Sequence, residues 1–207
     1  MDGVVVELSE HRGQVRPGRL DGPSIMALIF AGLVLLYAAC NAVAVVMAGE
    51  VILRVQNGGG ELALANLPAG VELVWPYQLS VPGALAPLGS VVLLKLAEAL
   101  IPLLWGGVLL GIGLLLREAS GVDTIFDGGV ARRVATVRWL LVVLAVVPHG
   151  LRVLGSNWAL GGLGTGFSTS TRLGDMFIPL FGFYLCLAFE FVLRRGEALQ
   201  GELDEVI

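Results

Sequence analysis

Five ionisable residues stand inside or beside long apolar stretches, where a charge is costly. They are Lys95, Glu98, His149, Arg152 and Asp175. A charged side chain near the centre of a bilayer costs about 2.5 to 3.5 kcal/mol on insertion scales, so each one needs a partner or a purpose. The apolar runs around them place all five at a similar depth, near one surface of the membrane. Side chains of this kind could move protons or bind a charged ligand.

Two interpretations of this polar layer are open. In the first, it forms a polar pocket or a proton-linked site. In the second, the residues pair between helices, and Lys95 and Arg152 extend to the interface. The second is favoured because the residues lie only one to three helical turns below the predicted surface. Pro102, four residues after Glu98, has no N–H and should leave the Glu98 carbonyl free and bend that helix.

The sequence offers little for catalysis. The two histidines fall on opposite sides of the predicted membrane, and neither cysteine has a neighbour at metal-ligand spacing. No nucleophile, base and acid can be placed at one depth. The stretch GGLGTG (161–166) lacks the strand and the Lys-Ser or Lys-Thr of a phosphate-binding loop, which indicates a flexible loop. We therefore predict no catalytic residue, metal or cofactor, and no enzymatic activity.

The end of the chain, LAFEFVLRRGEALQGELDEVI (187–207), carries a second group of charges. Glu190 precedes Arg194 by four residues, which predicts a structural ion pair within one helix. Beyond it, Leu199, Leu203 and Val206 repeat at helical spacing among acidic residues. Such a stripe needs a surface to lie against: the membrane, the neighbouring loop or a partner. The acids make anionic lipid the least favoured of these.

The elements that must position these residues are transmembrane helices. Of the 207 residues, 56% are hydrophobic and 14% are charged, far from the composition of a soluble domain. Four apolar runs each reach the roughly 20 residues needed to cross a bilayer, over 24–47, 91–116, 134–154 and 176–193. We predict an all-α four-helix bundle, a single membrane domain over 24–207 that follows an N-terminal segment, 1–23.

Basic residues set the predicted orientation. With the N-terminus inside, nine lie on the inner side (Arg12, Arg16, Arg19, Arg117, Arg132, Arg133, Arg138, Arg194 and Arg195) and four outside (Arg54, Lys95, Arg152 and Arg172). Inner loops carry the excess of Lys and Arg, so both termini are predicted to be cytoplasmic, with a tail over 194–207. The net charge of −4 argues against direct contact with nucleic acid.

The first external loop, 48–90, is the longest piece outside the membrane. It contains three β-prone runs, 51–55, 61–67 and 71–79, separated by glycine-rich or proline-containing turns. These predict two or three strands over the outer end of the bundle, although a plain connecting loop is an alternative. The second external loop, 155–175, is predicted to be flexible. Gly107 and Gly111 form a GxxxG motif, which indicates a close helix contact within the bundle or in a dimer.

Two segments carry a resemblance to a known family. The first contains Phe126, Ala131, Arg132, Arg133, Arg138 and Trp139, and the second Leu187, Ala188, Arg195, Gly196, Leu199, Glu202, Asp204 and Val206. Together with the four spans, these resemble the bacterial inner-membrane family called domain of unknown function 2975 (DUF2975). The resemblance implies no enzymatic activity. It also implies a small helix-turn-helix regulator as a partner at the cytoplasmic face.

The leading hypothesis is therefore a non-enzymatic protein of the bacterial inner membrane that binds a partner at its cytoplasmic face. The partner is a regulator or another membrane subunit, including a second copy of the chain. The predicted contact surface consists of Arg132, Arg133, Arg195, Leu199, Glu202, Leu203 and Val206. The alternatives are a small transporter or ligand sensor that uses the outer polar layer, or an immunity-type membrane protein. Membrane lipid surrounds the chain in every case.

Overall fold

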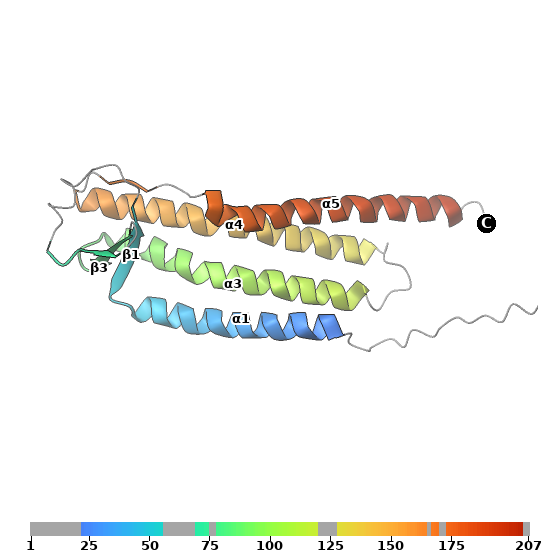
Figure 1. Ribbon diagram of the computed structural model, residues 1–207, viewed down its shortest axis with the longest axis horizontal. Coiled ribbons are helices and arrows are strands. Elements are labelled where there is room, and N and C mark those ends of the chain that lie inside the picture. The colour runs from blue at the N-terminus through green and yellow to red at the C-terminus, as the bar shows by residue number, and fades with distance from the viewer. Residues whose placement is uncertain are drawn as a thin grey trace, which may run out of the picture.

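The computed structural model describes residues 22–55, 69–74, 78–119, 128–164, 167–169 and 173–204. Four long helices and a small sheet make up this part of the chain (Figure 1). The helices are α1 (Gly22–Met47), α3 (Leu88–Ala119), α4 (Gly128–Gly162) and α5 (Leu173–Asp204), and the strands are β1 (Glu50–Arg54), β2 (Glu72–Val74) and β3 (Gln78–Pro82). Each helix is long and apolar enough to cross a membrane, the pattern of a multi-pass membrane protein.

Each helix packs against the next one in the chain. Extensive helix contacts in the described residues join α1 to α3, α3 to α4 and α4 to α5. The four helices therefore form a row in which α1 and α5 are the edges, rather than a ring closed between the first and last helix (Figure 1). The sheet lies at one end of this row, called here the sheet end. The start of α1 and the end of α5 lie at the opposite end, called here the far end.

Glycines on two faces of α3 allow its neighbours to approach closely. A Cβ added at Gly106 or Gly113 would meet the side chain of Leu35 or Leu28 on α1 at 2.6 and 2.9 Å, respectively. The predicted GxxxG pair faces the other way: a Cβ at Gly111 would come within 2.8 Å of Val137 on α4. Of the two open readings of this motif, the structure therefore shows a contact within the chain.

The predicted β-rich segment between the first two spans is confirmed. Its strands are antiparallel in the order β1-β3-β2, with Ile52 opposite Ser80 and Leu73 opposite Leu79. Two of the three predicted β-prone runs correspond to these strands, because 51–55 became β1 and 71–79 supplied β2 and the start of β3. The run over 61–67 lies outside the described residues.

The sheet rests on α3 and α4. Alternate residues of β1 and β3 (Val51, Leu53, Leu79 and Val81) are buried and pack with Leu94 of α3 and with Ala159 and Leu160 of α4. The inward-facing residues occur at every second position, as expected for a strand with one covered face. The sheet is thus fixed to the two central helices of the row.

The prediction of a flexible loop over 155–175 is wrong for its first part and at its end. Helix α4 continues to Gly162, and α5 already begins at Leu173. The small residues are needed for packing here: a Cβ at Gly155 would meet the Ser90 carbonyl oxygen of α3 at 3.1 Å. Gly164, with φ 66°, follows the helix in the left-handed conformation that often ends helices.

Helix α5 is displaced toward the far end relative to α4. It begins further from the sheet end than the last residues of α4 and ends beyond the first residues of α4 (Figure 1). The predicted tail over 194–207 is therefore a direct continuation of the fourth span as far as Asp204. The predicted N-terminal segment, 1–23, lies almost entirely outside the described residues, since α1 begins at Gly22.

Candidate functional site

A buried ion-pair group joins α4 to α5 toward the far end. One carboxylate oxygen of Glu190 accepts a hydrogen bond from Arg138 Nη1 at 2.6 Å, and the other accepts one from Arg194 Nη2 at 2.7 Å. The Glu190 side chain is 7% exposed, that of Arg138 18% and that of Arg194 70%. The predicted Glu190–Arg194 pair is confirmed, and Arg138 is an additional partner.

This group is suited to holding two helices together. Both oxygens of Glu190 accept hydrogen bonds from guanidinium groups on two different helical positions, and such charge-assisted contacts are among the strong ones. Removing one member of such a buried pair would leave an uncompensated charge in an apolar region. We therefore assign Glu190 a structural role. Sequence reasoning missed Arg138 because its partner is 52 positions away, on another helix.

The residues of the predicted contact surface fall into two groups at the far end. Arg132 and Arg133 are exposed at the start of α4, where Arg133 pairs with Glu118 at the end of α3. Arg195, Leu199 and Glu202 are exposed on the last turns of α5. Leu203 belongs to the same helix. Val206 lies outside the described residues.

At the sheet end, Lys95 interacts with the end of α1 and not with the other charges. Its Nζ donates to the carbonyl oxygens of Val46 at 3.1 Å and Ala48 at 2.6 Å. These are among the last carbonyls of a helix, which lack helical donors and carry partial negative charge. Lys95 therefore caps α1 and fixes its position against α3.

Glu98 lies one turn further into α3, next to the proline predicted to free its carbonyl. The side-chain amide of Asn41 on α1 donates to that carbonyl oxygen in a long hydrogen bond of 3.4 Å. The carbonyl released by Pro102 thus has a donor from the neighbouring helix. The Glu98 carboxylate itself points elsewhere.

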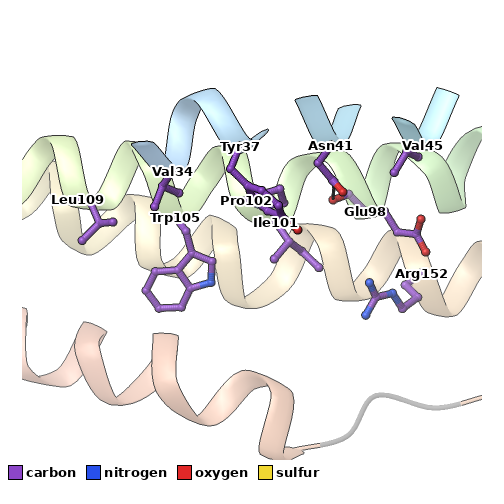
Figure 2. Close-up of a pocket in the computed structure, with 10 residues that line it drawn as sticks. All are labelled: Val34, Tyr37, Asn41, Val45, Glu98, Ile101, Pro102, Trp105, Leu109 and Arg152. Atoms are coloured by element: carbon purple, nitrogen blue, oxygen red, sulfur yellow. Dashed lines mark hydrogen bonds between the residues drawn. The ribbon is translucent and has the colours of Figure 1, made fainter. Parts of the chain in front are cut away.

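The Glu98 carboxylate lines a cavity of about 650 Å³ between α1, α3 and α4. Figure 2 shows Glu98 across from Arg152 toward the sheet end, with the apolar Trp105 and Leu109 further along. No hydrogen bond or ion pair to another described residue engages either the Glu98 carboxylate or the Arg152 guanidinium. Two opposite charges therefore face one cavity without a direct pair between them.

A second cavity, of about 330 Å³, adjoins the first on the α5 side. It is lined by Arg54, His149, Arg152 and Asp175, together with apolar residues of α3, α4 and α5. Arg54, at the end of β1, donates to the Asp175 carboxylate at 2.5 Å and so ties the sheet to the first turn of α5. Arg152 lines both cavities.

The structure brings together four of the five residues of the predicted polar layer: Glu98, His149, Arg152 and Asp175. It adds Arg54 and Asn41, which sequence reasoning had not assigned. Asn41 could have been found, because it is a polar residue inside the first span. No local pattern in the sequence pointed to Arg54, because its partner is 121 positions away. Among the described residues, no group of three or more His, Cys, Asp or Glu is placed to hold a metal ion.

No protein-family model, curated protein or solved structure matches the chain.

Proposed function

We propose that this chain is a non-enzymatic integral membrane protein that binds a partner protein through the far end of α5. The observation that carries the proposal is the course of α5. It continues as one helix beyond the start of α4 and exposes Arg195, Leu199 and Glu202 on turns that project past the row of helices (Figure 1).

The composition of this segment supports protein contact. Leu199 is 48% exposed, on a stretch that also carries exposed Arg195, Glu197 and Glu202. Exposed helical turns of this length have little stability of their own, since short helices are marginal in water. A partner with an apolar groove and charges of both signs at its rim would complement it.

The proposal places the far end in the cytoplasm of a bacterium. The excess of basic residues on that side supports this orientation, as the positive-inside rule requires. The resemblance to the DUF2975 family supports a helix-turn-helix regulator as the first partner to test. The exposed Arg132 at the start of α4 then lies on the same side as the end of α5.

Site-specific photo-crosslinking tests the proposal. A benzoylphenylalanine at position 199 is expected to give a discrete protein adduct in native membranes, while the same residue at position 197 gives much less. Both positions are exposed on α5, but they lie about 160° apart around the helix, from a rotation of 100° per residue. The adduct should also disappear when Leu203 is replaced by Ala.

Two results would contradict the proposal. One is equal crosslinking at 197 and 199, which would mean that the segment meets its surroundings without a preferred face. The other is co-purification of the same proteins after deletion of residues 196–207, which would place the contact elsewhere.

A further inference from the structure

Three cavities of the membrane part share lining residues. Ile101, Trp105 and Arg152 line both the cavity of Glu98 and the cavity of Asp175. A third cavity, of about 570 Å³, continues from Trp105 and Ile178 toward the far end between α3, α4 and α5. It is lined almost entirely by apolar side chains, among them Leu141, Leu185 and Phe189. The second and third cavities therefore lie next to each other in one crevice between α3, α4 and α5, polar toward the sheet end and apolar over the rest.

The crevice has the dimensions of a lipid chain. Along α3 it extends from Ile101 to Leu115, which corresponds to about 21 Å at 1.5 Å per residue. One leaflet accounts for about 15 Å, half of the roughly 30 Å hydrocarbon core, so the crevice is long enough for a lipid chain that spans one leaflet. The cavity of Glu98 runs from Arg152 along α1, past Val34 and Leu109. Trp105 lines both this cavity and the crevice, so two apolar channels lie beside that residue.

The charges at the polar end are of both signs. Arg54 and Asp175 neutralise each other in a direct pair, and Lys95 is engaged by the carbonyls at the end of α1. This leaves the Glu98 carboxylate and the Arg152 guanidinium, which face the same cavity without a hydrogen-bonding partner among the described residues. Near a membrane, two such groups are stabilised by a ligand that carries a cation and an anion close together.

We propose that this crevice binds one zwitterionic phospholipid with a primary ammonium group, phosphatidylethanolamine, from the leaflet at the sheet end. Its phosphate contacts Arg152, its ammonium group contacts Glu98, and its two chains occupy the apolar channels beside Trp105. A fatty acid would bring an anion to Arg152 but no cation to Glu98. A phospholipid with an uncharged alcohol headgroup would have the same lack. The proposal concerns the opposite end of the molecule from the partner surface and does not depend on it.

Quenching of tryptophan fluorescence by lipids with brominated chains tests this directly. The chain has four tryptophans, so replacing Trp75, Trp139 and Trp158 by Phe leaves Trp105 as the only reporter. The purified variant is reconstituted in phosphatidylglycerol bilayers that contain a small fraction of brominated phosphatidylethanolamine or brominated phosphatidylglycerol. We expect the half-saturating fraction of phosphatidylethanolamine to be about tenfold lower than that of phosphatidylglycerol, as the one additional charge-assisted contact, from the ammonium group to Glu98, would give.

A matched reporter and three variants separate a specific site from general lipid contact. A protein with Trp139 as the only tryptophan, whose side chain is 61% exposed, reports bulk lipid and should be quenched equally by both headgroups. In the Trp105 reporter, Glu98→Gln should remove the preference for phosphatidylethanolamine. Arg152→Gln should weaken quenching by both lipids, and Arg117→Gln, at the far end of α3, should change neither.

Several outcomes would overturn the proposal. If Trp105 is quenched in proportion to the brominated fraction for both headgroups, the crevice holds only exchanging bulk lipid. If it is not quenched by either, the crevice holds a protein segment or a second copy of the chain. If Glu98→Gln leaves the headgroup preference unchanged, or Arg152→Gln leaves quenching by both lipids unchanged, while circular dichroism shows intact helices, the headgroup is not recognised by these charges.

Discussion

At the scale of single residues, the polar side chains within the membrane part are mostly paired, and their partners come from neighbouring helices. Asn41 supplies a donor for the carbonyl freed by Pro102, Lys95 caps α1, and Arg138 completes the pairing of Glu190. Each contact satisfies a group that would otherwise be left unpaired in an apolar region. Among the described residues, the exceptions include the buried hydroxyl of Ser156, which has no hydrogen-bond partner, and the side chains of Glu98 and Arg152, which line a cavity.

Glu190→Gln should lower the free energy of unfolding by about 3 kcal/mol, because it leaves Arg138 and its charge nearly buried without a carboxylate. Arg194→Gln should cost less than about 1 kcal/mol, since Arg194 is 70% exposed and such pairs contribute little. Unfolding in detergent by denaturant titration measures both. A larger effect from Arg194→Gln would mean that the exposed partner carries the pairing.

Replacing Asn41 by Ala should destabilise the protein by about 0.6 kcal/mol, the average for a hydrogen bond between membrane helices. The hydrogen bond is long, at 3.4 Å, so its contribution to the free energy of unfolding should not exceed this average. The cost should vanish in a Pro102→Ala background, where the helix supplies its own N–H to the Glu98 carbonyl. Equal costs in both backgrounds would show that Asn41 acts through another contact.

At the scale of elements, the four spans were predictable because each is a long apolar run, and the small sheet because its alternating runs are separated by turns. The ends of the helices were not predictable. Gly155 and Ser156 are typical of a loop, yet both are buried in the part of α4 that packs beneath the sheet. The ion pairs that fasten α5 join positions 52 and 121 residues apart, and no local pattern reports such distances. Consequently the sequence indicated which residues were unusual, but not which of them meet.

The two glycine faces of α3 make a matched pair of predictions. Gly106→Ala should destabilise the protein by about 1 to 3 kcal/mol, because the new methyl group would lie 2.6 Å from the Leu35 side chain, which must shift or carry α1 with it. Gly107→Ala should be neutral or stabilising by up to about 1 kcal/mol, because its nearest neighbour, Leu140, is 3.9 Å away. Thermal unfolding of the two variants side by side checks this. Equal effects would mean that α1 does not pack on Gly106.

At the scale of the whole molecule, the two ends of the row have different characters. The sheet end has a covered core, a tie from Arg54 to Asp175 and the mixed charges of the cavities. The far end has exposed arginines and the projecting turns of α5. The proposed functions follow this division, with lipid recognition at one surface of the membrane and protein recognition at the other.

The predicted orientation can be tested by cysteine labelling in intact cells. With Cys40 and Cys186 replaced by Ala, Ile52→Cys on the sheet should react with a membrane-impermeant maleimide, since Ile52 is 47% exposed. Glu202→Cys, on the exposed end of α5, should react only after the membrane is permeabilised. The reverse pattern would place the sheet in the cytoplasm and contradict the positive-inside assignment.

The packing of each helix on its neighbour in the chain also has a consequence for biosynthesis. As each helix leaves the ribosome, the preceding helix in the row has already been made. Strand β1 can pair as soon as β3 has been made. Local contacts of this kind close small loops and form quickly. The Arg54–Asp175 tie is different, because it joins a residue made early to one made late. It can therefore form only once the fourth helix has been started, long after β1 was made, in a molecule that otherwise assembles in the order of its synthesis.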